Sequence, residues 1–286
     1  MLGKTRNYIF LLLPALLVLL ALGAYPIFRA AFISLHEWSL VAETHPFVGL
    51  QNYIRAFNDP QFLYSLRVTG IFVLGAVSVQ TILGVGIGVL FRRNWPGFGT
   101  FRSLFFLPML VAPIAVGLLW RFIYRPEIGI VDVILNALGF GTPTWLGDPR
   151  TVVGAVLATS IWQWTPFVVL LVLAGLSNIP EELYEAASLD GANGFQSFFR
   201  ITLPLLKPTL VTAVMLRGIG AFKIFPRVFM LTRGGPGNMT RTVSYYIYNT
   251  GFKFFEMGYA AAMSIIMLIL VVILTQTVIR TSRIKM

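Results

Sequence analysis

Long apolar runs alternate with short polar segments along almost the whole chain. A hydrocarbon layer about 30 Å thick needs roughly 20 residues of α-helix to cross it, and apolar runs of this length recur along the sequence. The pattern predicts an all-α membrane protein, a polytopic helical bundle with six transmembrane helices in a single transmembrane domain over residues 1–286. The predicted spans are Tyr8–Ala31, Tyr64–Leu90, Phe101–Tyr124, Thr151–Leu176, Pro208–Met230 and Gly258–Ile279.

Glycine and proline divide these spans unevenly. Gly84, Gly86 and Gly88 lie near the end of the second span, where residues without a side chain let another helix pack closely. Pro108 and Pro113 interrupt the third span. We expect them to kink it and to free backbone carbonyls that neighbouring groups must satisfy.

One polar segment, residues 178–207, lies between two apolar runs yet has helical order of its own. Asn178 with Glu181 predicts a helix start, and Gly191 predicts its stop in a left-handed turn. Asn193 with Gln196 repeats the capping spacing, and the helical periodicity that follows continues to Pro204. We therefore predict two short helices that meet at Gly191. An amphipathic helix lying on the membrane surface is the alternative, but such helices favour basic residues, whereas this one is acidic.

The short charged segments suggest an orientation. The segment before the first span, the turn around Pro96 and the C-terminal tail are basic and contain no acid. Short basic segments favour the cytoplasmic side, so we expect both termini and residues 178–207 in the cytoplasm. Residues 32–63, 125–150 and 231–256 then form outer loops, with short helical pieces around 52–57. A cleaved signal peptide is the alternative for the first span, which exceeds the usual apolar core of about 7 to 15 residues.

Composition excludes several classes of protein. With 57% hydrophobic and 12% charged residues, the chain has too little polar surface for an ordinary soluble domain. Its net charge of +11 comes from residues scattered at the ends of apolar runs, so we expect membrane lipid rather than nucleic acid as its surroundings. It has no cysteine and two histidines, in no metal-binding spacing, and a metal site is not expected.

The predicted spans contain no Asp or Glu, although proton-coupled transporters and intramembrane hydrolases need acids within the membrane. The chain also has no phosphate-binding Gly-x-x-x-x-Gly-Lys-Ser/Thr motif. We therefore expect a protein that is not itself an enzyme and binds no cofactor. If ATP is used, it must be hydrolysed by a separate polypeptide.

A few polar residues within the spans are candidates for solute contact. Arg217 lies at mid-depth, where an arginine must face water, backbone carbonyls or a substrate. Gln163 lies beside aromatic residues, and sugars bind to walls that combine an amide with ring faces. Helix packing is the alternative for each aromatic residue, and Lys223 and Arg227 are close enough to the outer end to snorkel.

The segment with Glu185-Ala186-Ala187, then Gly191 after three residues and Ile201-Thr202-Leu203-Pro204 after nine more, resembles the EAA loop of binding-protein-dependent ABC importer permeases. The stretches LPMLVAPIAVGLLWRFIY, IWQWTPFVVLLVLAGL and GGPGNMTRTVSYYIY are similar to the carbohydrate-uptake subgroup (maltose, glycerol phosphate and trehalose-type permeases). The resemblance covers nearly the whole chain.

The resemblance implies a pore-forming subunit in the bacterial cytoplasmic (inner) membrane, with residues 178–207 as a cytoplasmic coupling loop. It implies a second, non-identical permease as heterodimer partner, two copies of an ATP-binding subunit that carry ATP and Mg, and an extracytoplasmic solute-binding protein. The implied ATPase-coupling residues are Glu185, Ala186, Ala187, Asp190, Gly191, Ile201, Leu203 and Pro204. The implied substrate-binding residues, on the spans that flank this loop, are Ser160, Gln163, Trp164, Phe167, Arg217, Ala221 and Ile224.

Three functions stay open at this point. The first is import of a neutral carbohydrate, either a sugar, an oligosaccharide or a polyol. The second is the same architecture importing an anionic solute, such as a glycerol phosphate or a sulfonated sugar, with Arg217 and Lys223 as counter-charges. The third is a membrane channel or enzyme that does not use ATP.

Overall fold

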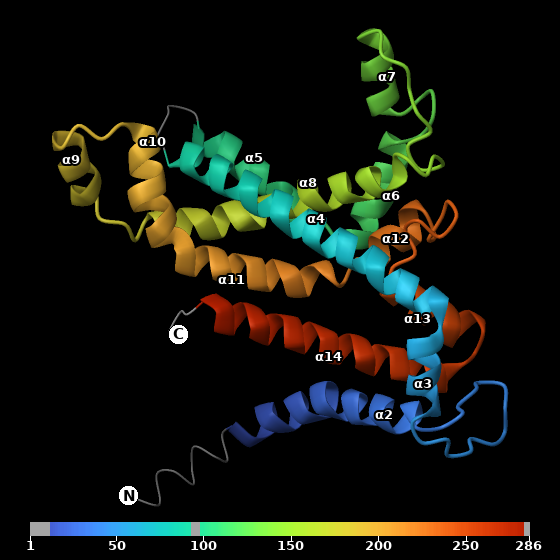
Figure 1. The fold of residues 1–286 in the computed structure, drawn as a ribbon. Helices are drawn as coiled ribbons and strands as arrows, with labels where there is room; N and C mark the ends of the chain where they lie inside the picture. Colours follow the sequence, from blue (N-terminus) through green and yellow to red (C-terminus); the bar gives the residue numbers. More distant parts are fainter. Residues whose placement is uncertain (1–11, 93–97, 283–286) are drawn as a thin grey trace, which may run out of the picture. The chain divides into compact units, whose positions relative to one another are not determined.

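The computed structural model describes residues 12–92 and 98–282, and helices account for most of those ranges. Within them no strand forms, and the two β-bridges are isolated. Three short π-helical segments, η1, η2 and η3, cover Leu20–Ala24, Phe198–Thr202 and Asn249–Lys253. The α-helices (Figure 1) are α2 Tyr25–Ser34, α3 Gln51–Asn58, α4 Pro60–Phe91, α5 Phe98–Leu110, α6 Pro113–Ile123, α7 Ile130–Ala137, α8 Val152–Leu176, α9 Glu182–Leu189, α10 Gly194–Ser197, α11 Leu203–Ala221, α12 Phe225–Leu231, α13 Val243–Tyr248 and α14 Met257–Ser282.

The predicted all-α architecture with six spans is confirmed. Five helical stretches are long and apolar enough to cross a membrane, and a bent pair of helices makes the sixth. The five are Leu12–Ser34, Pro60–Phe91, Val152–Leu176, Gly194–Ala221 and Met257–Thr281. The predicted starts at Tyr8 and the basic turn around Pro96 lie outside the described residues.

The third span is broken rather than kinked. The chain bends by 104° between α5 and α6, across the two residues between Leu110 and Pro113. Pro113 starts α6, where the missing N–H of proline is no loss, and Pro108 lies inside α5. The sequence therefore located the interruption correctly but underestimated its size.

The fifth span differs from its predicted range, Pro208–Met230. Its helix starts earlier, because α10, η2 and α11 form one continuous helix from Gly194 to Ala221. It also ends earlier, since Lys223 and Ile224 lie in the short break before α12. Pro204 and Pro208 do not stop the helix: Pro204 occupies the first turn of α11, after the π-helical turn.

The chain divides into two compact units. One joins the chain up to Tyr64 with Tyr246–Leu270, and the other joins Ser65–Tyr245 with the residues from Val271 onward. This division does not test the predicted single domain over residues 1–286, which stays a prediction.

In the larger unit, α4 packs tightly against α8 through two of the three predicted glycines. A Cβ at Gly84 would lie 2.4 Å from Cγ1 of Val168, and a Cβ at Gly88 would lie 2.5 Å from Cγ1 of Val172. Both distances are shorter than carbon atoms allow. Gly86, between them, faces open space. Without a hydrophobic driving force between helices in lipid, such close backbone approach is what stabilises a pair.

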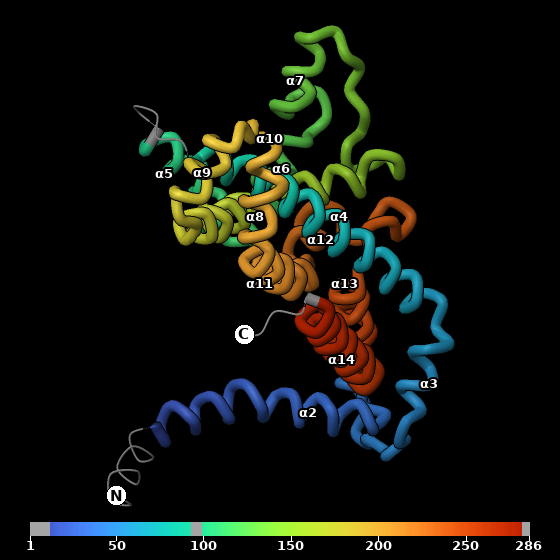
Figure 2. Tube along the Cα trace, turned by 60° about the vertical axis from the view of Figure 1, so that its left-hand side comes forward, coloured from blue at the N-terminus to red at the C-terminus, as the bar shows by residue number. Residues whose placement is uncertain are grey.

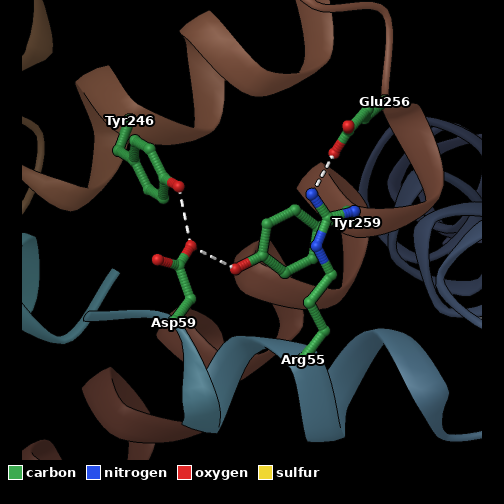
Figure 3. Close-up of polar contacts among 5 residues, drawn as sticks. All are labelled: Arg55, Asp59, Tyr246, Glu256 and Tyr259. Carbon is green, nitrogen blue, oxygen red and sulfur yellow. Dashed lines mark hydrogen bonds and ion pairs between the residues drawn. The ribbon is translucent and has the colours of Figure 1, made fainter. Parts of the chain in front are cut away.

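In the smaller unit, Asp59 joins the start of α4 to α13 and α14 (Figure 3). Its Oδ2 accepts hydrogen bonds from the hydroxyls of Tyr246 at 2.7 Å and Tyr259 at 2.6 Å. Beside it, the Arg55 guanidinium pairs with Glu256 at 2.8 Å and lies over the ring of Tyr259. Burial raises the pKa of Asp59, but the two tyrosine hydroxyls and the N–H groups of Gln61 and Phe62 together outweigh it and lower that pKa below 3.8.

We predict that alanine at Gly84 or Gly88 destabilises the protein by about 1–3 kcal/mol, because the added methyl group overpacks the α4–α8 contact. Alanine at Gly86 is the matched control, and we expect it to be neutral or slightly stabilising. Thermal unfolding in detergent measures the difference. Equal midpoints for the three variants would contradict the packing described above.

We predict that Asp59→Asn lowers stability by about 1 kcal/mol at neutral pH, because the charged acceptor is replaced by a neutral one of the same shape. A carboxyl group with a lowered folded-state pKa stabilises the fold above its unfolded pKa. That stability is lost as the pH falls through the folded pKa, below 3.8 for Asp59. The difference in unfolding midpoint between the wild type and the variant should therefore shrink on acidification below pH 3.8, whereas a constant difference would assign the effect to packing.

Candidate functional site

The predicted coupling loop, residues 178–207, is built around Gly191. α9 ends just before it, and Gly191 adopts a φ of +79°, a left-handed conformation that glycine takes without strain. The next helix starts with a complete capping box: the Asn193 side chain accepts from the N–H of Gln196, and the Gln196 side chain accepts from the N–H of Asn193. The predicted turn and second helix start are confirmed.

Two local predictions about this loop are wrong. Asn178 does not cap α9, because its amide donates back to the carbonyl of Ala174 at the end of α8. α9 starts at Glu182, without a side-chain cap. The second helix is not a separate short helix that ends at Pro204, since it continues through the π-helical turn into α11. Only one isolated helix, α9, therefore lies between the fourth and fifth spans.

Polar and aromatic contacts hold α9 against the ends of two spans. The Tyr184 hydroxyl is 2.9 Å from Oγ1 of Thr202, beside the start of α11. The Arg92 guanidinium, just beyond α4, lies over the ring of Tyr184 and pairs with Glu181 at 3.6 Å. Ion pairs this exposed contribute little, so the packed ring and the hydroxyl pair carry the attachment.

The outward surface of the loop is apolar and acidic. Leu189 is 90% exposed and Phe195 is 73% exposed. Of the predicted coupling residues, Glu185, Ala186, Asp190, Gly191 and Pro204 are exposed, and Ala187, Ile201 and Leu203 are half-buried. Exposed large apolar residues next to carboxylates are typical of a surface that a partner protein covers.

The arginine at mid-depth is held by a glutamine from another span. Nε of Arg217 donates to Oε1 of Gln80 at 3.0 Å, and Nε2 of Gln80 donates to the carbonyl of Ser160 at 2.9 Å. The guanidinium also lies 4.6 Å from the ring centre of Trp164. This first relay joins α11, α4 and α8, and both ends of the Gln80 amide are used.

A second relay has the same chemistry. Nη2 of Arg227, in α12, donates to Oε1 of Gln163 in α8, and Nε2 of Gln163 donates to the carbonyl of Val111 at 2.7 Å. Val111 lies at the break between α5 and α6, so its carbonyl has no partner one helical turn away. Gln163 thus satisfies a carbonyl that the proline interruption frees, as the sequence predicted for this span.

The relays place two positive charges where the spans contain no carboxylate. Arg217 and Arg227 are each 3% exposed, and their charges repel one another. Glutamine oxygens and the Trp164 ring provide partial negative charge without a counter-ion. The interior of this unit is therefore electropositive.

The structure brings together part of the predicted substrate-binding set. Gln80 joins Ser160 to Arg217, and the Arg217 guanidinium lies over the Trp164 ring, whereas Gln163 belongs to the second relay. The remaining three contribute apolar surface. Phe167 packs edge-on against Trp164, Ala221 joins a cluster with Val73 and Val77, and Ile224 is 2% exposed at the start of α12. The polar members already have protein partners, so their contact with solute stays a prediction.

Gln80 is the residue that sequence reasoning missed. It is fully buried in the second span, and a primary amide in an apolar run signals a required hydrogen-bond partner. Among the described residues, no group of three His, Cys, Asp or Glu side chains could hold a metal ion.

Comparison with known proteins identifies the family. Residues 80–282 match the model of the family described as binding-protein-dependent transport system inner membrane component. The trehalose/maltose transport system permease protein MalF of Thermococcus litoralis is 37% identical over 96% of this chain and 93% of its own length. The sulfoquinovosyl glycerol transport system permease protein SmoG of Agrobacterium fabrum is 35% identical over 99% of this chain and 92% of its own.

The fold also has solved counterparts. A chain of a bacterial ABC transporter involved in the import of the acidic polysaccharide alginate superposes with a TM-score of 0.85. The alignment covers 99% of this chain and 98% of that one, at 21% identity. The same type of transporter has been solved in complex with an alginate-bound periplasmic protein, and it matches with a TM-score of 0.86. Together with the six helical spans and the exposed loop around Gly191, these matches show that the chain belongs to the family of binding-protein-dependent transport system inner membrane components, a family of transporters rather than enzymes.

Proposed function

We propose that this chain forms one half of the pore of an ATP-driven importer that carries a carbohydrate into the cytoplasm. Relatives with 32–37% identity are named for uptake of trehalose and maltose, arabinooligosaccharides and diacetylchitobiose. The observation that carries the proposal is the loop of α9, Gly191 and α10. Its exposed surface has the residues of a coupling element, and α10 is continuous with the helix of the fifth span.

In this proposal, α9 docks into a groove of an ATP-binding subunit on the cytoplasmic side. Glu185 would contact a basic rim of that groove, and the small side chains of Ala186 and Ala187 would allow close packing. Leu189 would bury its exposed apolar surface there. Ile201, Leu203 and Pro204 would brace the loop against the spans.

The continuous helix provides the mechanical connection. About 23 residues separate Gly194 from Arg217, or roughly 35 Å at 1.5 Å per residue. A displacement of α10 would therefore move the α11 side of the first relay along one continuous helix, and the Gly191 turn would join α10 to the docked α9. ATP shifts the pore between its two states only through contacts that differ between them, and we assign the Arg217–Gln80 pair to this role because it joins the continuous helix to α4.

The complete transporter would contain further chains. We propose a second, non-identical permease, two copies of an ATP-binding subunit that carry ATP and Mg, and an extracytoplasmic solute-binding protein. The complex of the similar alginate transporter with a periplasmic protein supports the last of these partners. We place the chain in the bacterial cytoplasmic membrane with both termini in the cytoplasm, because the short basic segments favour that side.

An anionic solute is the second candidate. The two buried arginines give the interior a positive charge that no carboxylate within the spans offsets. One relative is named for sulfoquinovosyl glycerol, and the similar solved transporter imports an acidic polysaccharide. A carboxylate or sulfonate on the solute would complement that charge during passage.

We predict that Glu185→Lys in the assembled transporter uncouples ATP hydrolysis from uptake, because it reverses the charge that faces the ATPase groove. Uptake into proteoliposomes should fall at least tenfold, while ATP hydrolysis is retained. Arg200→Gln, a charge change at the π-helical turn outside the predicted set, is the control and should leave the ratio of solute to ATP intact. A normal ratio in the Glu185→Lys transporter would remove α9 from the coupling role.

We predict that Gly191→Val also uncouples, because a β-branched residue cannot adopt the φ of +79°. Gly191→Asn is the matched variant, since asparagine tolerates the left-handed region, and it should keep most of the uptake. Equal losses in both variants would show that the turn geometry is not what matters.

We predict that Gln80→Glu separates the two solute classes. The substitution keeps the shape of the side chain but places a carboxylate 3.0 Å from Arg217, which cancels one of the interior charges. It also removes the donor to the Ser160 carbonyl, a loss that affects both solute classes alike. Uptake of a neutral oligosaccharide should change less than threefold, whereas uptake of an anionic one should fall more than tenfold. Ligand screening of the partner binding protein identifies which solute to use, and an anionic ligand would favour the second candidate.

A further inference from the structure

α7 has an apolar face without a partner in the part of the chain that the structure describes. It is an eight-residue helix between the broken third span and α8, in a segment that the sequence predicted only as a loop. At about 100° per residue, Ile130, Val133 and Ile134 fall on the side of the helix opposite to Asp132. The exposed large apolar residues of this segment are Ile128, Ile130, Val133, Ile134, Leu138 and Phe140.

The opposite face of α7 is tied down by its one acidic residue. Asp132 is 1% exposed, and its two oxygens accept from Nε1 of Trp145 at 2.6 Å and from the N–H of Glu127 at 3.0 Å. Asp132 is the only charged residue between Ile128 and Gly147. The exposed side of α7 therefore presents apolar surface without any charge, and the hydrogen bonds to Asp132 fix the direction in which that surface points.

Aromatic residues mark the level of the membrane surface at the root of α7. Trp145 packs against Tyr124 at the end of α6, and Tyr124 packs against Trp120. The Tyr124 hydroxyl also donates to the carbonyl of Ala155 in α8. Tryptophan and tyrosine collect where spans leave the hydrocarbon layer, because their rings are apolar and their N–H and O–H groups need polar partners.

The direction of α7 agrees with this level. Two views show it projecting to the side of α8, rather than extending the line of that span (Figures 1 and 2). A helix that leaves a span sideways at the aromatic level lies along the membrane, not above it.

A groove of about 490 Å³ lies next to these aromatic residues, and its lining suits a phospholipid. Its lining includes the apolar residues Leu118, Phe122 and Leu146 and the basic residues Arg121 and Arg125. Among the described residues, no carboxylate pairs with either arginine, and Arg121 makes only a long contact, 3.4 Å, with the carbonyl of Met230. Two arginines without a carboxylate partner in an otherwise largely apolar groove match the phosphate and the acyl chain of a phospholipid.

We propose that residues 121–147 form a lipid-docking element at the membrane surface remote from the coupling loop. The apolar face of α7 enters the boundary between headgroups and acyl chains, and Arg121 and Arg125 hold the phosphate of a phospholipid whose chain lies in the groove. The element would fix the end of the broken third span in the membrane while the coupling loop moves the fifth span. A soluble binding protein or a second permease would instead cover α7 with protein.

Site-directed labelling distinguishes these occupants. The chain has no cysteine, so a thiol-reactive label attaches to it only at the introduced position. A nitroxide is attached at Ile134→Cys, on the apolar face, or at Asn136→Cys, the matched control on the other face, in the complete transporter in lipid nanodiscs. We expect the label at position 134 to be accessible to oxygen and protected from a water-soluble nickel relaxant, and the label at 136 to show the reverse. Equal exposure of both labels to nickel would overturn the proposal, and so would protection at position 134 that depends on adding the binding protein. Protection of the label at position 134 from both relaxants would also overturn it, because it indicates a protein partner.

Native mass spectrometry tests the groove. We expect the purified transporter to retain a phospholipid that Arg121→Gln with Arg125→Gln reduces at least fivefold. Arg150→Gln, just beyond the element and outside the groove, should retain it fully. Phosphatidylglycerol and phosphatidylethanolamine should both be retained, since both contain the phosphate that the two arginines would hold. Added inorganic phosphate should not replace the lipid. The assignment would be contradicted if the double variant retained the phospholipid unchanged, or if Arg150→Gln lost as much phospholipid as the double variant.

Discussion

Backbone and charged groups inside the hydrocarbon layer need partners within the protein, and the two glutamine relays provide partners for two buried arginines, although Nε of Arg227 is left without one. Gln163 satisfies the carbonyl freed where the third span breaks, and its oxygen accepts from Arg227. Gln80 connects Arg217 to the main chain of α8 in the same way. An amide serves this purpose because it donates and accepts at once, whereas a carboxylate would only accept. The relays therefore allow a broken span and two buried charges in one apolar bundle.

The relays also bear on movement. Each one joins a helix of the C-terminal half, α11 or α12, to the spans before the coupling loop. The close α4–α8 contact at Gly84 and Gly88 makes one side of the first relay rigid. The other side belongs to the continuous helix that starts at the coupling loop. In the proposed importer, the first relay lies at the boundary between a fixed group of helices and a moving one, and Arg217 would need a new partner whenever that hydrogen bond opens.

Much of the fold was predictable because the membrane imposes a length and an apolar composition on each span. The predicted limits of the fourth span, Thr151 and Leu176, agree with the helix Val152–Leu176 to within a residue. The turn at Gly191 and the capping box at Asn193 were also readable, since both depend on residues close together in sequence. The predictions failed where a helix continued through proline, at Pro204 and Pro208, because packing and a π-helical turn accommodate the missing N–H groups.

The sequence by itself determined that the chain crosses a membrane, that an acidic segment with a glycine turn lies between its fourth and fifth spans, and that its spans hold arginines without acids. These properties follow from composition and short-range spacing. Only the tertiary structure decided which partner each buried polar group has. Arg217 meets Gln80 across 137 positions of the chain, and Gln163 meets Arg227 across 64. A hydrogen bond between residues so far apart depends on how the helices pack and rotate against one another, and periodicity along one helix does not contain that information.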